Sequence, residues 1–194
     1  FLDYLSVFQF TGDVRAIPEG RLYFADEPVI EVTAPLIESQ IVETFILNQM
    51  SFQSLIATKA ARCVSVSRER SCIDFALRRT HGTDAGMKVS RSSYLTGFES
   101  TSNVLAGKEY GIPLAGTMAH SYIASFPSEL DAFRAYAQSY PDSCVLLIDT
   151  YDTVYGARNA VVVGQELEIQ GHHLRGVRLD SGDLIGLSYK VREI

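Results

Sequence analysis

The chain has 194 residues, of which 46% are hydrophobic and 21% charged, and its formal net charge is −6. These proportions are typical of a globular protein that makes a core without disulfides or a structural metal. No apolar run is long enough to span a membrane, and the acidic balance is unlike that of a nucleic-acid-binding protein, so we expect neither a membrane nor a nucleic acid as partner.

Charge and cysteine content narrow the function further. A basic segment extends from Arg68 to Arg91, whereas the rest of the chain is acidic. Such a local cluster favours a small anionic ligand held in one cleft. The three cysteines, Cys63, Cys72 and Cys144, form no CxxC pair. Their odd number indicates reduced, mostly buried thiols in a cytoplasmic protein and argues against zinc.

The first part of the chain predicts a small α+β domain. Short strand-like runs occupy 21–24 and 29–32, and from Pro35 the apolar residues follow a helical period that continues to Ile56. Pro35 suits the start of that helix because its missing N–H would be unpaired there in any case. We therefore expect residues 1–50 to form part of an N-terminal α+β domain with its connecting helix.

The remainder repeats a strand-then-helix pattern. Apolar runs at 72–77, 112–117, 144–149 and 174–180 each end in polar residues, and helical patterns cover 128–140 and 152–167. The last three strand ends lie roughly 30 residues apart, which is the length of one βα unit. This predicts an α/β fold, either a barrel or an open parallel sheet, whose ligand binds at the carboxyl ends of the strands.

The first two strand ends offer groups that bind anions or transfer protons. Arg78 and Arg79 follow the first strand, and a guanidinium pairs well with phosphate or carboxylate, although adjacent side chains point different ways. Thr117 and His120 follow the second strand. From the residues alone, His120 is a proton carrier, a nucleophile or a histidine with a structural role.

The other two strand ends carry acids. Asp149 and Asp152 can hold magnesium through its waters or bind a sugar diol. Arg178 and Asp180 are two residues apart and hence on the same side of a strand, while Asp183 is placed to cap the next helix. These groups indicate an enzyme for a small anionic, phosphorylated sugar-like substrate with a divalent cation.

Five motifs resemble the nicotinate phosphoribosyltransferase family, whose members are type II phosphoribosyltransferases. In the family's order they are DFALRR at 74–79, YLTGF with STSNVLAG at 94–107, GTMAHS at 116–121, LIDTYDT at 147–153 and GVRLDSGD at 176–183. The resemblance implies that nicotinate displaces pyrophosphate from 5-phosphoribosyl 1-pyrophosphate to give nicotinate mononucleotide, with ATP hydrolysis, in NAD salvage.

The resemblance also implies roles for three catalytic residues. His120 matches the histidine that ATP transiently phosphorylates, which makes the protein a phosphoprotein. Asp180 and Asp149 match partners of the ribose hydroxyls or of magnesium-bound pyrophosphate. Mg²⁺ is thus the implied cofactor and ATP a co-substrate.

Six further residues match substrate-binding positions. Thr117 and Arg178 match contacts to nicotinate, and Ser181 lies in the same motif as Arg178. Phe75 is implied to lie against the pyridine ring and Arg78 to meet phosphate. Ser102 stands where related nicotinamide enzymes carry an aspartate, which would repel an acid, so serine favours nicotinate. The substrate-binding set is Phe75, Arg78, Ser102, Thr117, Arg178 and Ser181.

The resemblance further implies that residues 51–194 form an incomplete α/β (TIM-like) barrel that carries the active-site motifs, and that the protein is a homodimer. It leaves three alternatives: a nicotinamide phosphoribosyltransferase, a quinolinate phosphoribosyltransferase or a non-catalytic paralogue. The chain lacks the family's opening segment, which brings an aromatic residue to nicotinate, and its late glycine-rich phosphate loop. We therefore expect the 194-residue chain on its own to be inactive or weakly stable.

Overall fold

The computed structural model describes all residues, 1–194, and they form two compact units, Phe1–Ala115 and Gly116–Ile194. The structure is mixed α/β and mostly helical, with three separate two-stranded sheets, two of which are parallel. None of the helices combines the length and apolar content that a bilayer-crossing segment requires. The α/β prediction is confirmed, whereas a domain boundary at residue 50 stays a prediction.

The first unit begins with helix α1 (Leu2–Ser6) and an antiparallel hairpin of β1 (Asp13–Ala16) and β2 (Ile30–Thr33). The strand predicted near 29–32 is confirmed, but the one at 21–24 is wrong. That segment lies between two left-handed turn residues, Gly20 (φ 84°) and Asp26 (φ 67°), which fold it into a loop. The true partner strand, β1, is only four residues long and exposed throughout, so its short polar–apolar alternation is a weak signal.

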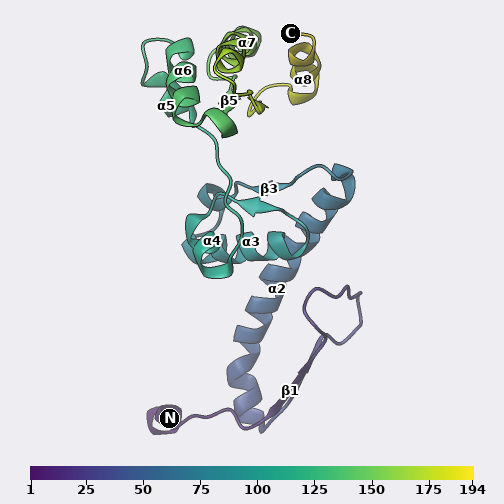
Figure 1. Cartoon of the computed structure of the whole chain (residues 1–194). Helices are drawn as coiled ribbons and strands as arrows, with labels where there is room; N and C mark the ends of the chain where they lie inside the picture. Colours follow the sequence, from purple (N-terminus) through teal and green to yellow (C-terminus); the bar gives the residue numbers. More distant parts are fainter. The chain divides into compact units, whose positions relative to one another are not determined.

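The long helix predicted from Pro35 is confirmed as α2 (Leu36–Ser67), which follows the hairpin in Figure 1. It ends where Arg68 and Glu69 both adopt left-handed backbone, with φ of 50° and 66°. The loop between the hairpin strands is fastened to the next helix, α3 (Thr83–Leu95), because the guanidinium of Arg91 donates hydrogen bonds of 2.7 and 2.8 Å to the two carboxylate oxygens of Glu19.

The second half of the first unit packs against α2. Strand β3 (Ile73–Asp74) pairs in parallel with β4 (Ser100–Thr101). The other elements of this half are the 3-10 turn η1 (Leu77–Arg79), α3 and α4 (Val104–Tyr110). Helix α3 lies across α2 in Figure 1. The strand predicted at 72–77 is shorter than expected, and the one at 112–117 is reduced to a single bridge from Leu114 to Thr101. Pro113 has no N–H to donate, which limits pairing there.

In the second unit, strands and helices alternate around a hydrophobic core. Its elements are α5 (His120–Ala124), α6 (Glu129–Ser139), η2 (Pro141–Ser143), β5 (Val145–Leu147), α7 (Thr153–Ile169), β6 (Gly176–Arg178) and α8 (Leu184–Arg192). The helices predicted at 128–140 and 152–167 are confirmed as α6 and α7. Strand β5 pairs in parallel with β6, and Leu146, Leu147 and Ile148 are fully or almost fully buried against Phe133 and Val163.

Two acids of the second unit act as helix caps. The carboxylate of Asp183 accepts a hydrogen bond from Gly186 N at 3.1 Å, which confirms the capping prediction. Asp152 does the same for α7, accepting from Tyr155 N at 2.7 Å. The structure thus gives Asp152 a capping role, while its contact with magnesium or a sugar diol stays a prediction.

One glycine allows α7 to approach β5. A Cβ at Gly156 would clash with the backbone carbonyl oxygen of Ile148, so the first turn of α7 lies directly against the residue that precedes Asp149. A hydrogen atom is the only side chain that fits there.

All three cysteines are free thiols, as predicted, but only Cys144 is buried. Burial raises the pKa of the Cys144 thiol to about 11. Cys63 is exposed because it lies on the outer side of α2, so the expectation of mostly buried thiols is wrong.

Candidate functional site

Six of the predicted site residues lie in the second unit, at the ends of β5 and β6 and at or just before the start of α5. Asp149 lies two residues beyond β5 and Asp180 two residues beyond β6, while His120 is the first residue of α5. Since β5 and β6 are parallel neighbours, their ends meet at one edge of the sheet. Hydrogen bonds connect all six: Thr117, His120, Asp149, Arg178, Asp180 and Ser181.

Arg178 joins two of these residues. Its Nη1 donates to Thr117 Oγ1 at 2.6 Å and its Nη2 to Asp180 Oδ1 at 2.6 Å. The prediction that Arg178 and Asp180 share one side of the strand is confirmed. The hydrogen bond from Arg178 lowers the pKa of the Asp180 carboxyl, and His120 shifts it in the same direction, so this group is an anion at neutral pH.

His120 lies between a hydroxyl and a carboxylate. Its Nδ1 is 3.1 Å from Thr150 Oγ1 and its Nε2 is 3.4 Å from Asp180 Oδ2. A carboxylate only accepts, so an imidazole with one proton holds it on Nε2 and leaves Nδ1 to accept from the Thr150 hydroxyl. The side chain is 43% exposed and thus open to a reactant. Thr150 escaped the sequence reasoning, although it directly follows Asp149 at a strand end.

Asp149 anchors the loop that carries Asp180. Its Oδ2 accepts from Asp180 N at 2.8 Å and from Ser181 Oγ at 2.7 Å. Its Oδ1 is buried and has no hydrogen-bond partner. A buried carboxylate oxygen without a donor is costly, so this atom is suited to a ligand hydroxyl or a cation. No cluster of three or more His, Cys, Asp or Glu that could by itself hold a metal ion occurs in the chain.

Three predicted residues lie in the first unit. Phe75 is 42% exposed and lines a cavity of about 540 Å³ between α2, α3 and the turn after β3. Arg79, not Arg78, lines the same cavity, while Arg78 is exposed on the η1 turn. Ser102 directly follows β4 and its N–H donates to Asp74 O at 2.8 Å. Phe75 and Ser102 therefore follow paired strand residues.

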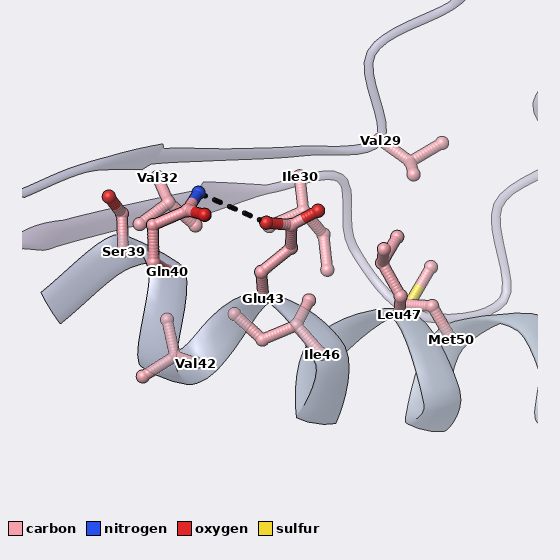
Figure 2. A pocket seen from close by; sticks show the side chains of 10 residues that line it. All are labelled: Val29, Ile30, Val32, Ser39, Gln40, Val42, Glu43, Ile46, Leu47 and Met50. Carbon is pink, nitrogen blue, oxygen red and sulfur yellow. Dashed lines mark hydrogen bonds between the residues drawn. The ribbon is translucent and has the colours of Figure 1, made fainter. Parts of the chain in front are cut away.

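A second hollow in this unit has a different character. A groove of about 330 Å³ lies between β2 and α2. In Figure 2, Val32 and Ile30 of β2 lie opposite Gln40 and Glu43 of α2. Glu43 is its one ionisable lining residue, and that carboxylate accepts a hydrogen bond from the side chain of Gln40. None of the predicted site residues lines this apolar groove.

Most of the chain matches models of one known protein family. A model of the nicotinate phosphoribosyltransferase (NAPRTase) N-terminal domain matches residues 1–51, and the model of the NAPRTase family matches residues 70–193. Mycobacterium tuberculosis nicotinate phosphoribosyltransferase pncB2 is 51% identical over 192 residues, covering 99% of this chain and 41% of that protein. Bacillus subtilis nicotinate phosphoribosyltransferase is 44% identical over 180 residues, covering 92% and 36%.

Solved structures of related enzymes also match the fold of this chain. The crystal structure of human nicotinic acid phosphoribosyltransferase matches with a TM-score of 0.90 and 34% identity, over 100% of this chain and 48% of that one. The Pyrococcus furiosus nicotinate-nucleotide pyrophosphorylase matches with a TM-score of 0.82 and 25% identity, over 95% and 48%. The chain thus spans less than half the length of these relatives. Its sequence and fold together show that the chain belongs to the nicotinate phosphoribosyltransferase (NAPRTase) family.

Proposed function

We propose that this chain is part of an enzyme, a nicotinate phosphoribosyltransferase that makes nicotinate mononucleotide and pyrophosphate from nicotinate and 5-phosphoribosyl 1-pyrophosphate, with ATP hydrolysis, in NAD salvage. The observation that carries the proposal is the continuous series of contacts Thr150–His120–Asp180–Arg178–Thr117. It joins a nucleophile, its orienting carboxylate and a carboxylate-binding guanidinium within one strand-end cluster.

Arg178 and Thr117 supply the nicotinate contacts in this proposal. The substrate carries a carboxylate, and a guanidinium binds that group with charge-assisted hydrogen bonds in a planar fork. The hydroxyl of Thr117, already 2.6 Å from Arg178 Nη1, adds a neutral donor beside the charge. Nicotinamide lacks the negative charge and gains less from Arg178.

His120 is the proposed acceptor of a phosphoryl group from ATP. With Nε2 protonated toward Asp180, its Nδ1 carries the lone pair that attacks the γ-phosphorus, forming an N–P bond as the P–O bond to ADP breaks. The Asp180 anion stabilises the positive charge that develops on the ring. Thr150 gives up its hydrogen bond to Nδ1 as the new bond forms.

The ribose end of the substrate is proposed to meet the acids. Displacement at the sugar C1 develops positive charge, which Asp149 and Asp180 stabilise. Asp149 Oδ1, which is buried without a partner, fits a ribose hydroxyl or a Mg²⁺ ion bound mainly by pyrophosphate oxygens and water. When bound, the ion neutralises charge on the departing pyrophosphate.

The first unit contributes further contacts in this proposal. Phe75 lies against the pyridine ring, Arg78 meets a phosphate and Ser102 disfavours nicotinamide. Ser181 binds substrate beside Asp149. A cytoplasmic location, consistent with three free thiols, and a homodimer complete the proposal.

Labelling tests the mechanism. The full-length protein is incubated with ATP labelled at the γ-phosphate, comparing wild type with His120→Ala and with His172→Ala, whose ring Nδ1 lies 2.8 Å from Asp142 Oδ1. We expect acid-labile label on wild type and on His172→Ala but none on His120→Ala. No label on wild type would contradict the phosphohistidine role.

A substrate comparison tests the reaction. Nicotinate, nicotinamide and quinolinate are each supplied with 5-phosphoribosyl 1-pyrophosphate, and mononucleotide and pyrophosphate are measured. We expect nicotinate to have the highest kcat/KM. A preference for either of the other pyridines would identify an alternative phosphoribosyltransferase, and no turnover of any would identify a non-catalytic paralogue.

A further inference from the structure

We propose that Asp74 is a positioning residue for the pyridine substrate, holding Phe75 and Ser102 in place together. This inference rests on the proposed function, in which Phe75 faces the ring and Ser102 sets the preference for nicotinate. Asp74 has no contact with substrate in this proposal; it acts through the backbone of the two turns that follow β3 and β4.

The carboxylate of Asp74 is the centre of a buried hydrogen-bond network. Its side chain belongs to a residue that is only 5% exposed. Oδ1 accepts from Ala76 N at 2.8 Å, and Oδ2 accepts from Ser90 Oγ at 2.7 Å and from Thr101 Oγ1 at 2.8 Å. A buried charge is tolerated when it is paired or hydrogen-bonded, and here three donors meet it.

The network continues from Asp74 to the residues around Ser102. Thr101, which is 1% exposed, accepts a hydrogen bond from Asn103 N at 3.0 Å on the same hydroxyl oxygen that donates to Asp74. The backbone closes the connection, because Ser102 N donates to Asp74 O at 2.8 Å. One aspartate thus fixes the residue before Ser102 directly, and the residue after it through Thr101.

The same carboxylate fixes the backbone on the far side of Phe75. Phe75 lies between Asp74 itself and Ala76, whose N–H is bound by Oδ1. The Phe75 ring is 42% exposed, so packing restrains it less than it would a core ring. The anchored backbone is therefore an important determinant of where the ring stands.

The three donors are not equally dependent on Asp74. Ser90 Oγ also lies 3.0 Å from Gly86 O and can donate there if the carboxylate is removed. Ala76 N has Asp74 Oδ1 as its side-chain acceptor, and Thr101 is tied to Ser90 and Asn103 as well. Loss of the carboxylate is thus felt most at the turn of Phe75, and at the turn of Ser102 through Thr101.

Steady-state kinetics of the full-length protein test the proposal. The variants are Asp74→Ala, Asp74→Asn and Thr101→Val, with Ser100→Ala as matched control on the same strand, outside the network. We expect Asp74→Ala to raise KM for nicotinate by roughly 10- to 100-fold, as misplacement of contact groups does. We expect KM for 5-phosphoribosyl 1-pyrophosphate to rise less than KM for nicotinate, because Arg78, the proposed phosphate contact, lies two residues beyond Ala76 on the η1 turn and is displaced less than Phe75.

The variants should follow the network. Asp74→Asn retains an acceptor for Ala76 N, so its affinity for nicotinate should lie between that of Asp74→Ala and that of wild type. Thr101→Val removes one hydroxyl without changing the shape of the side chain and should lower the preference for nicotinate over nicotinamide. Ser100→Ala should match wild type. If Asp74→Ala does not fold, Thr101→Val and Asp74→Asn carry the test.

Three outcomes would overturn the inference. Lower Tm values with unchanged KM for nicotinate would show that the network only stabilises the fold. Equal rises in the KM of both substrates would show a general defect. A wild-type protein that converts no pyridine would overturn the proposed function and this inference with it, whereas an active wild type with unaffected variants would overturn this inference alone.

Discussion

Arg178 and Asp180 form an ion pair of 2.6 Å at the end of β6, so the guanidinium proposed to bind the substrate carboxylate already holds a carboxylate of the protein. Both side chains are partly exposed, at 25% and 30%, and the pair is therefore accessible to a ligand. A nicotinate carboxylate that binds Arg178 competes with Asp180 or shares the fork with it. Binding at this site is thus linked to the contact between Asp180 and His120.

Replacement of Arg178 by lysine is expected to impair nicotinate turnover. Lysine keeps the charge but cannot direct two planar N–H groups at Thr117 and a carboxylate together. Loss of a charge-assisted hydrogen bond of about 1.5–3 kcal/mol predicts a fall in kcat/KM for nicotinate of roughly 10- to 150-fold. Arg175→Lys, on the chain just before β6, is the control, since Arg175 donates only to Asp142 O. Equal kinetics for the two variants would contradict the role of Arg178.

The ion pair also predicts how stability depends on pH. The hydrogen bond from Arg178 lowers the pKa of Asp180 in the folded protein. The stabilisation is therefore fully present above the unfolded value, about pH 3.9, and is lost as the pH falls through the lower folded value. The Tm of wild type should exceed the Tm of Asp180→Asn at neutral pH, and this difference in Tm should shrink below about pH 4. In an Arg178→Gln background the Asp180→Asn substitution should have little effect on the melting profile.

Replacement of Asp152 should affect stability, whereas replacement of Asp149 should affect the catalytic rate. Asp152→Ala removes the cap of α7 and should lower the free energy of unfolding by about 1 kcal/mol, with near-normal kinetics. Asp149→Asn should instead lower kcat, because Asp149 Oδ1 is the unpartnered oxygen of the proposed ribose and Mg²⁺ contacts. Chemical denaturation and initial rates measure both effects. A large kcat loss in Asp152→Ala at unchanged stability would return it to the site.

Two glycines of α7 provide a matched pair for packing. Gly156→Ala would bring a Cβ against Ile148 O and should destabilise the protein by about 1–3 kcal/mol, since backbone must shift. Gly164→Ala places its Cβ 3.5 Å from Leu174 Cδ2, an ordinary contact, and should stabilise by up to about 1 kcal/mol. Thermal unfolding of both variants tests this. Similar changes in Tm for the two variants would show that α7 moves away from β5 to accommodate the new Cβ at Gly156.

Thiol reactivity should separate Cys144 from Cys63. The raised pKa, about 11, and full burial leave Cys144 without reactive thiolate near neutral pH. Iodoacetamide should therefore alkylate Cys63 in the folded protein and reach Cys144 only after denaturation, as peptide mass spectrometry would show. Alkylation of folded Cys144 at the rate of Cys63 would contradict the buried position.

The sequence predicted the elements whose pattern arises from local burial. Helices α6 and α7 each bury apolar residues, and β5 is a continuous apolar run, so their residues indicate their own conformation. Helix α2 was predicted from the same helical period, although its buried residues are Glu38 and Ala60 and most of its large apolar side chains are exposed. The pairing of Arg178 with Asp180 also followed from strand alternation. The loop at 21–24 was missed because the positive-φ turns at Gly20 and Asp26 determine it, and β1 was missed because four exposed residues give too short a pattern.

The sequence predicted which residues lie near the strand ends, but it did not predict the hydrogen bonds between them. That Thr150 contacts His120, or that Asp74 contacts Ser90 across 16 residues, depends on how helices pack on strands. Such contacts leave no pattern in the sequence, because each hydroxyl alone is an ordinary polar residue. The capping role of Asp152 likewise depends on where α7 begins.

The end of α2 has a consequence for how the first unit opens. Arg68 and Glu69 both adopt left-handed backbone, which disfavours residues with a Cβ by roughly 1–2 kcal/mol each. The long helix is thus joined to β3 through a strained corner that only the surrounding contacts maintain. Local opening releases that strain, so we expect the amide protons of this corner to exchange faster than those inside α2.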